Sequence, residues 1–166
     1  MKKRIFFYIV SALILFLLQS SLLSHFRIAD VVPNLLVIFT ASIAIIEGSL
    51  DGCLAGFICG LLLDVTYGPV TGMYALGFLI IGYAAGKTNR IFYREDITYP
   101  ILIIGASDIA YGIYMYLFGF LIRGRLDFLF YLGRIILPET VYTVILAVFL
   151  YRLILLIAVR LDKEKN

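Results

Sequence analysis

The feature that most constrains the fold is a series of six apolar segments that together take up most of the 166 residues. They run over residues 5–23, 33–47, 49–67, 72–86, 99–122 and 135–159. A helix needs about 20 apolar residues to cross the ~30 Å hydrocarbon core of a bilayer, and longer neighbours can shield the shorter second and fourth segments. We therefore expect an all-α integral membrane protein, a compact six-span bundle that forms a single domain over residues 1–166.

The composition supports a membrane protein rather than a soluble one. Hydrophobic residues make up 63% of the chain and charged residues 15%, with a mean hydropathy of +1.03, whereas a typical soluble domain is about 25% charged. The net charge is +3, but the lysines and arginines lie in loops and at the ends of apolar segments. We interpret them as topology signals and expect no nucleic-acid partner.

The distribution of basic residues predicts the orientation. With the N-terminus inside, ten lysines and arginines lie on the inner side and four, Arg27, Arg123, Arg125 and Arg134, on the outer side. Both termini are then cytoplasmic. The first segment has the basic head of a signal peptide but no small-x-small cleavage pattern, so we expect it to remain as the first span. Residues 123–134 are expected to lie in the outer interface.

Glycines recur at every fourth position in the third segment, although glycine costs about 1 kcal/mol relative to alanine in a water-exposed helix. In lipid, small residues four apart allow two helix backbones to touch. We expect helix-packing faces at Gly48, Gly52, Gly56 and Gly60 in the third segment, Gly82 and Gly86 in the fourth, and Gly105, Gly112 and Gly119 in the fifth. The spacing leaves open whether these faces pack within the chain or against a partner.

Asp108 falls near the middle of the fifth segment, where a charged aspartate costs at least ~2.5–3.5 kcal/mol. Three interpretations are open: an interhelical polar contact, a site for a proton, ion or substrate, and a polar contact with a partner helix. Ser107, Tyr111 and Tyr114 are the nearby hydroxyl candidates.

Asp64 and Glu139 are the other intramembrane polar residues, and both approach the outer boundary. We expect the outer arginines to neutralise these two acids. On the inner side Glu47 and Asp51 form an acidic pair at a tight turn, with the basic stretch KTNRIFYR from Lys87 as a candidate counterpart.

No catalytic constellation is present in the sequence. GYAAGKT, from Gly82, has only three residues between its glycines and no preceding strand, so it is not a phosphate-binding loop. His25 is the only histidine, and Cys53 and Cys59 have no further ligands for a metal set nearby. We expect no catalytic, cofactor or metal site, and no enzyme.

The stretch from Pro33 to Lys87 resembles the rod shape-determining protein MreD family. It contains a proline-led second span, an EG turn, a glycine-striped helix that ends in LLLD, and a G-x-x-x-G-M-Y-A-L loop. The last span, LPETVYTVILAVFLYRLI, is also similar, although Thr143 stands where an asparagine is expected. The resemblance implies a helical arrangement like that of the substrate-binding subunits of energy-coupling-factor transporters.

The same resemblance implies a non-catalytic protein of the bacterial cytoplasmic membrane that binds MreC. Further implied partners are RodA, its penicillin-binding transpeptidase and MreB filaments, and the basic residues suit anionic lipids. Candidate partner-binding residues are Asp64, Tyr74, Arg123, Arg125, Arg134 and Glu139, with the inner loop 87–96 as the cytoplasmic candidate. The alternative is a small-molecule or lipid-precursor transporter subunit with a cavity near Asp108.

Overall fold

The computed structural model describes residues 2–22, 31–68, 71–91, 97–121 and 127–163, and all regular elements in these ranges are helices. They are α1 (Lys2–Leu17), α2 (Leu35–Glu47), α3 (Ser49–Tyr67), α4 (Met73–Gly86), α5 (Thr98–Tyr116), α6 (Phe128–Tyr131) and α7 (Leu137–Lys163). Short π-helical turns extend α1 over Leu18–Leu22 and α5 over Leu117–Leu121, and a 3₁₀ turn, Lys87–Ile91, follows α4.

The expected all-α membrane class is confirmed. Four helical stretches are long and apolar enough to cross a bilayer, namely Arg4–Ser21, Ser49–Tyr67, Thr98–Gly119 and Phe128–Arg160. Helices α2 and α4 lie where the second and fourth spans were expected, but with 13 and 14 residues they extend only about 20 Å. The six-span topology therefore stays a prediction.

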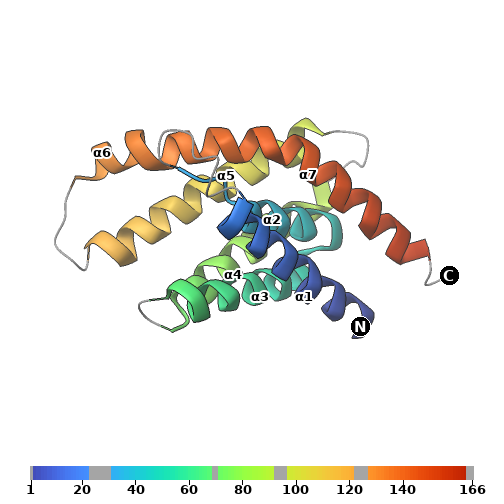
Figure 1. Cartoon of the computed structure of the whole chain (residues 1–166). Helices are drawn as coiled ribbons and strands as arrows, with labels where there is room; N and C mark the ends of the chain where they lie inside the picture. The colour runs from blue at the N-terminus through green and yellow to red at the C-terminus, as the bar shows by residue number, and fades with distance from the viewer. Residues whose placement is uncertain (1, 23–30, 69–70, 92–96, 122–126, 164–166) are drawn as a thin grey trace.

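Helix α2 is the centre of the bundle. Its residues from Leu35 to Ile45 are all buried, and Leu36, Ile38 and Phe39 are almost completely inaccessible. Such a helix, apolar on every side, must be surrounded by protein or lipid. Helices α3 and α4 lie on one side of α2, and α5 and α7 lie on the other (Figure 1). Burial within the protein explains how so short a helix can exist in a membrane protein.

The last helix differs from the expectation. The last span was expected at residues 135–159, but α6, the π-helical turn Leu132–Ile136 and α7 form one continuous helix from Phe128. The expected position of residues 123–134 in the outer interface stays a prediction, and residues 123–126 lie outside the described residues. The 33-residue apolar stretch of the continuous helix is about 50 Å long, more than the ~30 Å hydrocarbon core, because the helical hydrogen bonds continue without a break at Arg134. A helix of this length must therefore tilt strongly in the bilayer or project beyond the hydrocarbon.

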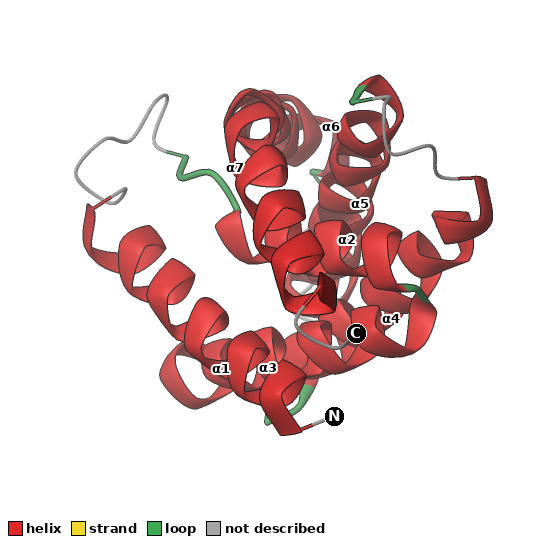
Figure 2. Cartoon of the chain, turned by 90° about the vertical axis from the view of Figure 1, so that its right-hand side faces the viewer, coloured by secondary structure: helices red, strands yellow, loops and turns green. Residues whose placement is uncertain are grey.

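The two chain ends lie on the same side of the bundle (Figures 1 and 2). We call this side the terminal end and the opposite side the far end. The terminal end contains the start of α1 and the α2–α3 turn, and the far end contains the starts of α2 and α4. The common side is what an N-in, C-in topology requires, while the side of the membrane stays a prediction.

Candidate functional site

Glycines bring α3 and α4 into backbone contact. A Cβ atom on Gly52 would lie 2.7 Å from the Gly82 carbonyl oxygen, and one on Gly60 would lie 2.6 Å from the Ala75 nitrogen. Gly56 faces the Phe78 carbonyl in the same way, and a Cβ on Gly86 would lie 2.5 Å from the Ser49 nitrogen. The stripe on α3 therefore contacts the backbone of α4 within one chain, so these faces are already covered.

The glycines of α5 face the continuous last helix instead. A Cβ on Gly105 would stand 3.0 Å from Val144, and one on Gly112 would stand 2.9 Å from Ile136. Side chains rather than backbone meet these positions, so the approach is less close than that of α3 and α4.

Two glycines differ from the packing role expected of them. Gly48 lies in the turn between α2 and α3 with φ +106°, and a Cβ there would have nothing within 4 Å. Glycine is favoured at Gly48 by the backbone conformation rather than by a neighbour. Gly119 also has no described atom near its Cβ position, because the α5–α7 contact has ended before this residue.

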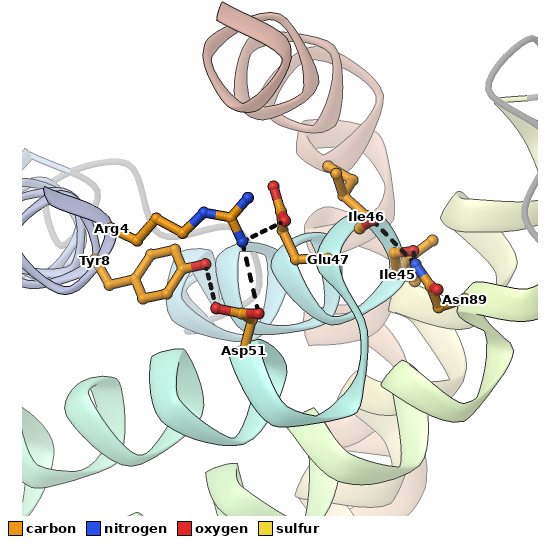
Figure 3. Close-up of polar contacts among 7 residues, drawn as sticks. All are labelled: Arg4, Tyr8, Ile45, Ile46, Glu47, Asp51 and Asn89. Atoms are coloured by element: carbon orange, nitrogen blue, oxygen red, sulfur yellow. Dashed lines mark hydrogen bonds and ion pairs between the residues drawn. The ribbon is translucent and has the colours of Figure 1, made fainter. Parts of the chain in front are cut away.

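The acidic pair at the terminal end contacts α1. The Arg4 guanidinium lies 2.9 Å from Glu47 and 3.8 Å from Asp51, and the Tyr8 hydroxyl donates to Asp51 at 2.9 Å (Figure 3). Of the predicted counterpart, KTNRIFYR, the described Asn89 contacts the end of α2, and residues 92–94 lie outside the described residues.

Asn89 donates its amide hydrogens to carbonyl groups at the end of α2. The acceptors are the carbonyl oxygens of Ile45, at 2.6 Å, and Ile46, at 3.0 Å (Figure 3). The loop after α4 therefore satisfies the last carbonyls of α2, which have no partner within the helix.

Asp64 was expected to pair with outer arginines, but it caps α4. Its two carboxylate oxygens accept the backbone N–H groups of Tyr74 and Ala75, each at 2.9 Å. The first N–H groups of a helix have no partner within the helix, so a carboxylate there is stabilised by hydrogen bonds and by the helix dipole. Arg123 and Arg125 lie outside the described residues.

Arg134 does not pair with Glu139 either. Arg134 is exposed, and no ion pair joins it to Glu139 although both side chains are described. Glu139 instead lies next to Asn34, the residue that precedes α2. The expected arginine cap is therefore wrong for Arg134.

Asp108 makes an interhelical contact with α7. The Thr140 hydroxyl donates to its Oδ2 at 2.9 Å, whereas its buried Oδ1 has no hydrogen-bond partner among the described residues. Asp108 accepts no hydrogen bond from Ser107, Tyr111 or Tyr114, the three hydroxyl candidates named from the sequence. The Tyr114 hydroxyl, for example, donates to the Met73 carbonyl oxygen at 2.9 Å.

The polar contact continues from α7 to α2. Thr143 Oγ1 accepts the backbone N–H of Asn34 at 3.0 Å, and the Asn34 side chain in turn accepts the N–H of Val37 at 3.2 Å. Both residues are buried. Thr140 was not singled out from the sequence, because threonines in an apolar helix are common, and Thr143 was noted only as a departure from the family pattern.

Asn34 also borders a cavity of about 370 Å³ at the far end. Its wall includes Asn34 and Glu139, the aromatic rings of Phe16, Tyr67, Tyr74 and Tyr111, and the apolar Val32 and Leu63. Asp108 lies behind this wall, through its contact with Thr140. Of the residues proposed from sequence, the structure therefore brings Tyr74, Glu139 and Asp108 together, whereas Asp64 is used in capping.

The model of a family described as rod shape-determining protein MreD matches residues 1–160. The chain belongs to the MreD family. No curated protein and no solved structure is significantly similar to this MreD chain. Membership confirms the resemblance inferred from the glycine-striped segment and assigns the protein to rod shape determination.

The MreD family is a shape-determining family rather than an enzyme family. In the described part of this chain, no group of three His, Cys, Asp or Glu side chains is placed to hold a metal ion. What the residues do offer is a closely packed helix pair, a cluster of ion pairs at one end and a polar cavity at the other.

Proposed function

We propose that this MreD is a non-catalytic membrane scaffold of the bacterial cell-wall elongation complex, which binds MreC and helps to couple peptidoglycan synthesis to cell shape. The observation that carries the proposal is the family match over residues 1–160. The packing agrees with it, because backbone contact between α3 and α4 makes a rigid body.

We place the MreC contact at the far end, on the long last helix, whose start we propose projects beyond the hydrocarbon. Leu129 and Phe130 of α6 are 81% and 67% exposed, on a helix that is longer than the bilayer is thick. Exposed apolar residues outside the hydrocarbon suit a protein partner. Two of the candidate partner residues lie near this end: Tyr74 at the start of α4, and Asp64 near the end of α3, which accepts its backbone N–H.

The cytoplasmic contacts in this proposal lie at the terminal end. Lys87 Nζ lies 4.7 Å from the centre of the Tyr83 ring, and we propose that this lysine meets anionic lipid headgroups. RodA, its penicillin-binding transpeptidase and MreB are further proposed partners. The protein would then be a multi-pass protein of the bacterial inner membrane with both termini in the cytoplasm.

Co-purification of MreC in mild detergent tests the scaffold. We expect stoichiometric MreC with the wild type and at least severalfold less with Leu129→Ala plus Phe130→Ala. Leu102→Ala on α5 is the matched control, because this leucine is similarly exposed, at 65%, but lies near the terminal end. Full MreC recovery with the double variant would place the interface elsewhere, and no recovery with the wild type would contradict the scaffold.

A second candidate function is a transporter subunit for a small molecule or lipid precursor, with a fold like the substrate-binding subunits of energy-coupling-factor transporters. The cavity of about 370 Å³ near Asp108 favours it. Transport by the reconstituted protein that is lost in Asp108→Asn would support this function over the scaffold.

A further inference from the structure

The described wall of the far-end cavity carries a carboxyl group. Glu139 is the one formally charged group among the described residues of its wall, and no described lysine or arginine lines it. The other polar groups there are amides and hydroxyls, such as those of Asn34 and Tyr111. A carboxylate in such a wall repels anions and attracts cations.

Asp108 adds a second negative group close behind the wall. It is 3% exposed, its Oδ2 is bound by Thr140, and its Oδ1 lacks a partner among the described residues. Thr140 directly follows Glu139 in α7, so the two carboxyl groups lie on neighbouring parts of one site and interact electrostatically. Two neighbouring acids in a region of low dielectric create a field that a positive ligand would relieve.

Aromatic rings supply the second element of recognition. Phe16, Tyr67, Tyr74 and Tyr111 all line the cavity, and the Phe16 and Tyr67 rings lie 6.1 Å apart, centre to centre. Faces of aromatic rings attract organic cations, and a cage of such rings beside a carboxylate is the arrangement that holds alkylated ammonium groups. The rings come from α1, α3, α4 and α5, so only the folded bundle assembles them.

We propose that this cavity binds an organic ammonium group, with Glu139 as its counter-ion and the aromatic rings around it. A volume of about 370 Å³ lies at the lower end of the range of ligand cavities, about 300–1,000 Å³, and suits a headgroup-sized amine rather than a large solute. The amine can belong to a membrane aminophospholipid or to a soluble molecule. Binding of this kind does not depend on MreC, so it goes beyond the scaffold role.

Titration calorimetry on the purified full chain tests the proposal. The protein is placed in nanodiscs of phosphatidylglycerol, which carry no amine, and is titrated with choline and with its uncharged isostere 3,3-dimethylbutan-1-ol. Titrations of empty nanodiscs are subtracted. We expect choline to bind at least about tenfold more tightly than the isostere, because only the charge differs.

Two variants assign the binding to this site. Glu139→Gln should weaken choline binding about tenfold or more, while Asp127→Asn, which removes an exposed acid outside the cavity wall, should leave it unchanged. Should Glu139→Gln fail to fold, Tyr67→Leu at the exposed rim should weaken binding about threefold. Equal binding of choline and isostere, no choline binding, or an unchanged affinity in Glu139→Gln or Tyr67→Leu would overturn the proposal.

A second set of nanodiscs identifies the source of the amine. With phosphatidylethanolamine added, a severalfold loss of apparent choline affinity means that the lipid headgroup occupies the cavity. An unchanged affinity means that the ligand is a soluble amine. Both results support an ammonium site. Because MreC is absent throughout, failure here would leave the scaffold role to be judged by MreC recovery alone.

Discussion

Gly52 of α3 and Gly82 of α4 lie backbone to backbone, so a Cβ on Gly52 would stand 2.7 Å from the Gly82 carbonyl oxygen. Contacts this close leave no room for a methyl group. They explain why the chain retains glycines that weaken an isolated helix: in lipid, helix association depends on close packing, because there is little hydrophobic drive between helices.

Alanine at Gly52 or Gly82 should therefore destabilise the protein. We expect the free energy of unfolding to fall by about 1–3 kcal/mol, because the methyl group must push the two backbones apart. Thermal unfolding in mild detergent measures the loss. Gly133→Ala is the control, because no described atom lies within 4 Å of its Cβ position, and its effect should stay within about 0.5 kcal/mol. Equal effects of the core and control variants would contradict the packing role.

Asp64→Asn should weaken the start of α4. The amide provides one acceptor where the carboxylate provides two, so one of the N–H groups of Tyr74 and Ala75 loses its partner. We expect a loss of about 1–3 kcal/mol. Thr66→Ala is the matched control. Thr66 lies on α3, the helix that also carries Asp64, but its side chain is exposed and its hydroxyl donates only to the Leu62 carbonyl oxygen. An unchanged free energy of unfolding in Asp64→Asn would show that these two hydrogen bonds do not stabilise the protein.

Thr140→Val should leave the Asp108 carboxyl group without its described hydrogen-bond donor. We expect a loss of about 1–3 kcal/mol, since an unsatisfied buried polar group keeps its desolvation cost. Thr140→Ser retains the hydroxyl and should lose less. In a double-mutant cycle, Asp108→Val should lower the free energy of unfolding less in the Thr140→Val background than in the wild type. Additive losses would mean that the two residues are not coupled.

Arg4→Gln should lower stability modestly. Its guanidinium bridges Glu47 and Asp51, but the arginine side chain is 27% exposed, so solvent screens the attraction and we expect about 0.5–1 kcal/mol. Unfolding at low and high salt measures the ionic part, which should shrink as salt rises. Arg152→Gln, an exposed arginine on α7, serves as control. A salt-independent loss would point to packing rather than charge.

Reporter fusions test the orientation. Because both chain ends lie on one side of the bundle, fluorescent-protein fusions at either terminus should both fluoresce, and alkaline phosphatase fused after Asp127 should be active. One fluorescent and one dark terminus would contradict an even number of spans.

Most of the helical layout follows from local features of the sequence. Helix α3 occupies the predicted residues 49–67, and α4 begins one residue after its predicted start. Apolar stretch length, the glycine turn at Gly48 and the capping residue Asn34 are properties of one segment at a time. The continuous helix from Phe128 was missed, because the arginines there suggested a break that the backbone does not make.

The partners of the charged residues could not be predicted in the same way. The sequence indicates that Glu47, Asp51, Asp64 and Asp108 need neutralising or hydrogen-bonding groups, because charge is costly in a bilayer. It does not indicate which groups are nearest. Arg4 is separated from Glu47 by most of two helices along the chain, and Asp108 from Thr140 by 32 residues.

By itself, the sequence therefore determined the class of protein, the sites of close packing and the family, since apolar length and glycine spacing act along single helices. Only the tertiary structure decided that α1 neutralises the turn after α2, that Asp64 caps α4, and that four aromatic rings and Glu139 surround one cavity. These features depend on which helices become neighbours, and that choice is made by the packing of whole helix faces rather than by any one residue.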